Sequence, residues 1–115
     1  MFRRLSLPAH AFVELFAGLA LVVAALALSL GVAGTVALFT AGVVLAGIGL
    51  GAADSLPLAA HQALDRWLAT LMAAASVGLA LAGEATGALV LLAVAAGQLV
   101  LTGSTRWSRP RPAGA

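Results

Sequence analysis

Residues 15–53 read LFAGLALVVAALALSLGVAGTVALFTAGVVLAGIGLGAA, and this stretch contains no charged side chain. A helix needs about 20 predominantly apolar residues to cross a bilayer, so the stretch is long enough for two crossings. The glycines of SLGVAGT, residues 29–35, lie between the two apolar halves and are typical of a tight turn between helices. The stretch therefore predicts two membrane-spanning helices joined by a short turn.

The composition of the whole chain also indicates a membrane protein. Of its 115 residues, 63% are hydrophobic and 9% are charged, and the mean hydropathy is +1.12, whereas soluble domains carry about 25% charged residues. The net charge of +2 is too small for the electrostatic footprint of a nucleic-acid-binding protein. Cysteine is absent, which excludes disulfides and thiolate metal sites. The predicted partner is therefore the lipid bilayer, and no nucleic acid is expected.

Two more apolar intervals follow, one between Arg66 and Glu84 and one between Glu84 and Arg106. The first is long enough to span a bilayer once the amphipathic turn before Arg66 is included. Strands of a membrane barrel alternate apolar and polar residues, whereas these runs are apolar on all sides and rich in alanine and leucine, which are strong helix formers. The predicted fold class is an all-α membrane protein with four transmembrane helices, at residues 8–30, 33–53, 57–82 and 85–103.

The arginines predict how the helices are oriented. Basic residues that flank short membrane segments are retained on the cytoplasmic side. With four crossings all six arginines fall on one side, and the two turns on the other side contain none. We therefore expect both termini in the cytoplasm, with residues 1–7 as the N-terminal segment and residues 104–115 as a disordered tail. The arginines are Arg3, Arg4, Arg66, Arg106, Arg109 and Arg111.

The amino-acid usage indicates the source. A chain rich in alanine and arginine and free of lysine is typical of a high-GC bacterium. The predicted location is therefore a bacterial plasma membrane, which the protein crosses several times.

Two rare polar residues recur at a fixed distance along the chain. A shift of 51 positions lays His10 on His61 and Glu14 on Asp65, and it also superposes the turn around residues 31–34 on residues 82–85. Such matches predict a duplicated two-helix hairpin, with copies at residues 8–53 and 54–103. Because each hairpin crosses the bilayer twice, both copies enter from the same side, and the repeat is expected to be parallel, about a pseudo-twofold axis along the membrane normal.

The repeated histidine and acidic residue form the candidate functional site: His10, Glu14, His61 and Asp65. Residues four apart on a helix share one face, so each imidazole can meet the carboxylate of its own helix. Glu14 is expected about 9 Å into its helix, where a charge costs less than at the centre of the bilayer.

Three interpretations of these residues are open. In the first, each pair is satisfied locally at a helix start, and the two imidazoles lie more than about 10 Å apart; the shallow depth favours this arrangement. In the second, the four side chains converge and bind a divalent cation of unknown identity or relay protons. In the third, the two histidines ligate a haem, although the apolar slot that a haem needs would have to lie deeper than these residues.

Small residues at four-residue spacing predict where helices approach closely. The second predicted helix carries the densest set and is expected to make the closest packing, inside the bundle or against another copy. Gln98 is expected to make an interhelical hydrogen bond, and Glu84 is expected to be a solvated turn residue. The candidate packing pairs are Gly42/Ala46, Gly47/Gly51, Gly83/Gly87 and Ala93/Gly97.

The sequence gives no support for an enzyme or for a bound cofactor. It contains no phosphate-binding loop and no HExxH motif. The predicted function is a structural or accessory membrane protein that forms a homo-oligomer or joins a larger membrane complex. The alternatives are a small ion, proton or divalent-metal transporter or channel built around the His/carboxylate residues, and a membrane haem-binding protein.

Overall fold

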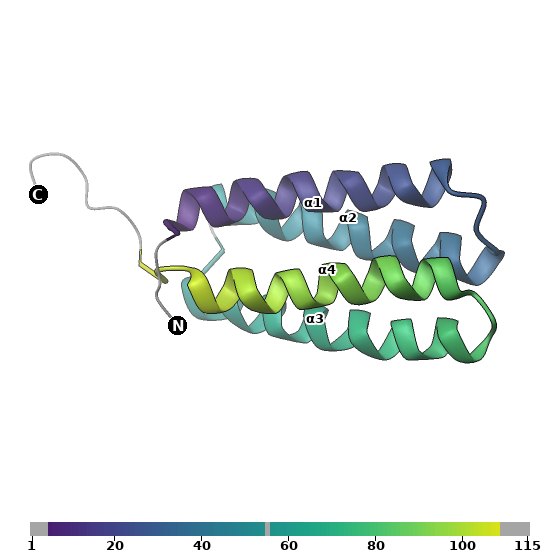
Figure 1. Ribbon diagram of the computed structural model, residues 1–115. Helices are drawn as coiled ribbons and strands as arrows, with labels where there is room; N and C mark the ends of the chain where they lie inside the picture. Colours follow the sequence, from purple (N-terminus) through teal and green to yellow (C-terminus); the bar gives the residue numbers. More distant parts are fainter. Residues whose placement is uncertain (1–4, 55, 109–115) are drawn as a thin grey trace, which may run out of the picture.

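The computed structural model describes residues 5–54 and 56–108. These residues form a bundle of long helices that run up and down beside one another (Figure 1): α1 (Leu7–Ala27), α2 (Val32–Asp54), α3 (Leu58–Leu81) and α4 (Ala85–Ser104). Each of the four helices is long and apolar enough to cross a membrane. The prediction of an all-helical chain with four candidate spans is confirmed.

The helix ends lie close to the predicted positions, except at the first turn. Ser6 caps α1 by accepting a hydrogen bond from the backbone N–H of Ala9 at 3.3 Å, and Pro8 lies in the first helical turn, where its missing N–H costs nothing. The helix ends at Ala27, three residues earlier than expected. The turn therefore occupies residues 28–31, and Gly34 lies inside α2.

The closest packing lies between α1 and α2. A Cβ atom built on Gly18 would lie 2.5 Å from the backbone nitrogen of Ala46 and 2.6 Å from the carbonyl oxygen of Gly42. A Cβ on Gly49 would lie 2.8 Å from the carbonyl oxygen of Ala11. The two backbones are thus almost in contact, and only glycine fits at these crossings. This agrees with the expectation that the second helix packs most closely.

The other predicted packing positions differ in how closely the neighbouring atoms approach them. A Cβ on Gly87 would approach the Leu79 side chain at 3.4 Å, and one on Gly51 would meet only the Leu56 side chain, at 3.8 Å. Ala93 is exposed. A Cβ on Gly47, Gly83 or Gly97 would meet nothing within 4 Å. Within a single chain, the close approach rests on Gly42 and Ala46, together with Gly18 and Gly49, two glycines that the sequence analysis had not selected.

The two helical hairpins, α1–α2 and α3–α4, meet chiefly through α2 and α3, and α1 and α3 lie diagonally across the bundle. The interior between them is an apolar cluster that includes Leu21, Leu38, Leu45, Met72 and Leu91. The outer surface exposes many large apolar side chains, which is the surface that a lipid environment favours.

Candidate cation site

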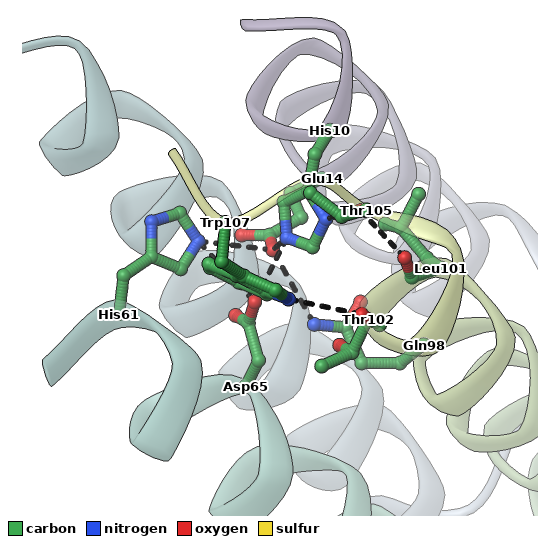
Figure 2. Close-up of polar contacts among 9 residues, drawn as sticks. All are labelled: His10, Glu14, His61, Asp65, Gln98, Leu101, Thr102, Thr105 and Trp107. Atoms are coloured by element: carbon green, nitrogen blue, oxygen red, sulfur yellow. Dashed lines mark hydrogen bonds and ion pairs between the residues drawn. The ribbon is translucent and has the colours of Figure 1, made fainter. Parts of the chain in front are cut away.

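The candidate residues from both hairpins meet inside one end of the bundle. His10 and Glu14 come from α1, and His61 and Asp65 come from α3. All four side chains are buried, with exposed fractions between 0% and 1%. Figure 2 shows them pointing toward one another from the two helices. We call these four residues the His/carboxylate cluster.

Each imidazole of the cluster contacts both carboxylates. His10 Nε2 lies 2.8 Å from Asp65 Oδ2 and also contacts Glu14 Oε1. His61 Nε2 lies 3.1 Å from Glu14 Oε1 and 3.3 Å from Asp65 Oδ2. One potential ligand atom from each residue fits within 4.8 Å of the other three. Nitrogen and oxygen atoms thus alternate around a common centre.

The expectation that the imidazoles lie more than about 10 Å apart is wrong, because their ring centroids are 5.2 Å apart. The reason lies in the helix face that carries them. On α1, His10 and Glu14 belong to the same buried stripe as Gly18, Leu21 and Ala25. A side chain on that stripe faces the bundle axis and cannot turn to the headgroups, so the two pairs converge.

Several polar atoms in the cluster or on the neighbouring helix α4 are buried and have no hydrogen-bond partner among the described residues. They are Glu14 Oε2, Asp65 Oδ1, His61 Nδ1 and Thr102 Oγ1. Leaving a polar group unpaired away from water costs about 1–3 kcal/mol, and more for a charged group. Two of these atoms are the second oxygens of the two carboxylates, whose other oxygens contact the imidazoles.

Helix α4 contributes polar contacts from a third side. Gln98 Nε2 donates a hydrogen bond to Glu14 Oε1 at 3.4 Å, which is the interhelical contact expected of this residue. Thr105 Oγ1 lies 2.6 Å from His10 Nδ1 and donates to the carbonyl oxygen of Leu101, also at 2.6 Å. The sequence analysis had not included Thr105. The available signal was its spacing, since Thr105 follows Gln98 by seven residues, or about two helical turns.

Trp107 covers the two histidines. Its ring centroid lies 4.9 Å from that of His10 and 5.3 Å from that of His61, both in edge-to-face contact. The indole N–H donates to the carbonyl oxygen of Thr102 at 3.0 Å. In Figure 2 the indole lies directly over the cluster. The sequence analysis had not included Trp107 among the candidate site residues.

The segment that carries Thr105 and Trp107 is paired with the start of the chain. Leu5 N–H donates to the carbonyl oxygen of Ser104 at 3.0 Å, and Arg106 N–H donates to that of Leu5 at 2.8 Å. These bonds form an isolated bridge between Leu5 and Thr105. The tail that the sequence analysis expected therefore begins with hydrogen-bonded residues, and residues 109–115 lie outside the described part.

Below the cluster the bundle interior is apolar. Leu21, Met72 and Leu91 are buried there, and the hydroxyl of the buried Ser76 is occupied by a 2.7 Å hydrogen bond to the carbonyl oxygen of Ala88. In the described chain, the polar contacts of the cluster reach no deeper than Gln98. The polar site is therefore confined to one end of the bundle.

Two nitrogen and two oxygen ligands suit a divalent transition metal. Zn²⁺ binds such atoms at about 2.0–2.2 Å in a tetrahedron, in which neighbouring ligand atoms lie about 3.3–3.6 Å apart. Three of the four nitrogen–oxygen distances, 2.8, 3.1 and 3.3 Å, lie near that separation, and the fourth contact, between His10 Nε2 and Glu14 Oε1, is shorter and would have to lengthen to admit an ion. A haem fits less well, because carboxylate oxygens contact both Nε2 atoms and occupy the space where a porphyrin plane would have to lie.

No protein-family model, no curated protein and no solved structure is significantly similar to this chain.

Proposed function

We propose that the chain is a small membrane protein that binds one divalent transition-metal cation through His10, Glu14, His61 and Asp65. Zn²⁺ is the cation whose ligand preferences fit best, since it accepts imidazole and carboxylate ligands in a tetrahedral arrangement. The observation that carries the proposal is the burial of four converging ligands, two of which have a carboxylate oxygen without a partner.

The charge balance favours a cation at this place. The ion pairs of Glu14 and Asp65 in the described chain are with the two histidines alone, and the Arg66 and Arg106 residues are exposed. Two buried carboxylates need compensating positive charge because water no longer solvates them. A metal ion supplies this charge directly. Protons carried by the imidazoles are the alternative, and the experiment below separates the two.

The cation would link the two hairpins. The ligands come in equal numbers from α1 and α3, which otherwise lie diagonally across the bundle. An apolar core closes the interior below the cluster, which favours a binding or structural role over conduction through a single copy. An accessory protein that self-associates or joins a larger complex agrees with this role.

The remaining sequence predictions complete the proposal. The protein would lie in a bacterial plasma membrane with both termini in the cytoplasm, so that the cation site faces the cytoplasm. The hairpins would be copies of one unit. In support, a shift of 51 positions lays five buried residues of α1 on buried residues of α3. Those on α3 are His61, Asp65, Ala69, Met72 and Ser76.

Metal titration of the purified protein tests the proposal. In detergent or nanodiscs, Zn²⁺ should bind at one equivalent, and Co²⁺ should show the visible absorption of tetrahedral coordination. A His10→Ala/His61→Ala double variant should lose both signals. A Thr70→Ala variant changes an exposed polar residue of α3 and should behave as wild type. If the wild-type protein folds but binds neither metal, the cluster holds protons and the proposal is refuted.

A further inference from the structure

In the described chain, the hydroxyl of Thr105 is the only polar contact of the His10 imidazole that lies outside the cluster. We infer that Thr105 is a positioning residue, which fixes the ring of His10 with its proton on Nδ1 and its Nε2 lone pair aimed at the cation. This inference rests on the proposed function for the identity of the ligand. It goes further by assigning a role to a residue outside the His/carboxylate cluster.

The direction of the hydrogen bonds follows from a count of hydrogens. A threonine hydroxyl has one hydrogen to donate. The carbonyl oxygen of Leu101 can only accept, and it lies 2.6 Å from Thr105 Oγ1, so the hydroxyl hydrogen is used there. At the 2.6 Å contact with His10 the hydroxyl oxygen must therefore accept. The donor is Nδ1–H of His10, and Nε2 remains the ligand atom.

The backbone holds Thr105 in place for this role. It is fully buried at the end of α4, and its backbone is extended, with φ −94° and ψ 141°. Leu5 bonds to the residues on both sides of it, Ser104 and Arg106. The hydroxyl is thus held at a fixed position relative to α1, and it reaches His10 across the bundle.

His61 offers a contrast within the same site. Its Nδ1 is buried and has no hydrogen-bond partner among the described residues, so no acceptor there holds a proton on Nδ1 and leaves Nε2 free for a cation. Metal-bound histidines usually donate their second N–H to a fixed acceptor, and removing that acceptor typically lowers metal affinity about 10–100-fold. We therefore expect the effect to be confined to the His10 side of the cluster.

Without the hydroxyl, His10 has a competing arrangement. Its ring can place the proton on Nε2 and donate it to Glu14 or Asp65, which both contact that nitrogen. A metal would then have to displace this proton before it could bind. Thr105→Val removes the hydroxyl and keeps the shape, whereas Thr105→Ser keeps the hydroxyl.

The experiment measures Zn²⁺ affinity by competition with a chromophoric chelator, using the full chain in detergent. Thr105→Val and Thr105→Ala should bind Zn²⁺ about 10–100-fold more weakly than wild type, and Thr105→Ser should restore most of the affinity. The matched control is Thr102→Val, which removes a buried hydroxyl that has no hydrogen-bond partner. If Thr102→Val weakened Zn²⁺ binding as much as Thr105→Val, the inference would be overturned, because loss of any nearby hydroxyl would then lower the affinity.

A second measurement observes the proton itself and needs no metal. The chain has two histidines, and ¹⁵N NMR of histidine-labelled protein distinguishes protonated from unprotonated ring nitrogens. His10 Nδ1 should be protonated in wild type and in Thr105→Ser, and unprotonated in Thr105→Val. An unprotonated Nδ1 in wild type would overturn the inference. If wild type binds no Zn²⁺, the proposed function fails. The protonation of His10 Nδ1 seen by ¹⁵N NMR then shows, without any metal, whether Thr105 positions His10.

Discussion

Glu84 accepts a hydrogen bond from the backbone N–H of Gly34 at 3.0 Å, so the turn between α3 and α4 caps the start of α2. The sequence analysis had treated Glu84 as a solvated turn residue; it does lie in the turn and is half-buried, but its hydrogen bond to α2 was not expected. The first N–H groups of a helix lack partners inside the helix, and a carboxylate there is also favoured by the helix dipole. Since a Cβ on Gly31 or Gly34 would lie 2.6–2.7 Å from Glu84 Oε1, both glycines leave room for this contact.

Loss of this cap should destabilise the bundle. Glu84→Ala removes the acceptor for Gly34 N–H, and losing a helix cap typically costs about 0.5–2 kcal/mol. Glu84→Gln keeps an acceptor oxygen and should cost less. Thermal unfolding in a mild detergent, followed by circular dichroism, measures the difference. The neighbouring exposed residue Thr86 gives the control Thr86→Ala, and equal effects at the two positions would contradict the capping role.

Glycine-to-alanine substitutions should destabilise the protein at the tight crossing of α1 and α2 but not on the open surface of α2. Gly18→Ala places a Cβ 2.5 Å from the backbone of α2, and overpacking of this kind costs about 1–3 kcal/mol. Gly47→Ala meets nothing within 4 Å and should be neutral or stabilising by up to about 1 kcal/mol, because alanine is the better helix former. Resistance to denaturing detergent provides the measurement. A Gly47→Ala variant that is less stable than Gly18→Ala would argue against the α1–α2 crossing or indicate that Gly47 contacts another copy.

Removal of the indole should speed up metal exchange. Trp107 covers both imidazoles, so Trp107→Ala should release bound Zn²⁺ to a chelator faster than wild type. The control is Trp67→Ala, which removes the chain's other tryptophan from an exposed position on α3. Stopped-flow chelator competition gives both rates. Unchanged release from Trp107→Ala would mean that the cation leaves by another route.

Acidification should weaken Zn²⁺ binding. A metal binds neutral imidazole and ionised carboxylate, so binding competes with protons at all four ligands and releases any protons they hold. The affinity should therefore fall as the pH is lowered, and isothermal titration in buffers of different ionisation enthalpy should detect proton release. Affinity that does not change with pH would exclude the histidines as ligands.

Labelling of introduced cysteines tests the orientation. The chain has no cysteine of its own. Ser29 is exposed in the turn between α1 and α2, and Ser108 is exposed after the end of α4; this turn and the end of α4 lie at opposite ends of the bundle in Figure 1. In intact cells a membrane-impermeant thiol reagent should label Ser29→Cys and leave Ser108→Cys unlabelled until the cells are opened. The reverse pattern would place both termini, and the cation site, outside the cytoplasm.

The helices were predictable from the sequence because their signal is local. Residues 15–53 lack charge over a length that only two spans explain, and small residues marked α2 as a close-packing helix. The end of α1 was missed by three residues because no glycine or proline lies between Gly18 and Gly31 to mark where the helix stops. The role of Gly34 at the start of α2 depends on Glu84, which is 50 residues away along the chain.

The candidate site was predictable in its residues but not in its geometry. The spacing of His10 and Glu14 correctly placed both on one helix face. It gave no information about whether that face meets the headgroups or the bundle axis, because the first turns of α1 are apolar on most sides. Thr105 and the covering role of Trp107 were missed for a related reason. Their contacts depend on the pairing of Leu5 with Thr105, and no local pattern encodes that bridge.

The bridge between Leu5 and Thr105 also determines when the site is completed during biosynthesis. The ribosome completes α1 first, but Thr105 and Trp107 follow α4 and are made only after all four helices. Until they emerge, His10 lacks its hydroxyl partner and neither imidazole is covered by the indole. A nascent chain that stalls in α4 would therefore present an open cluster, and the site would be completed only after the last helix has been synthesised.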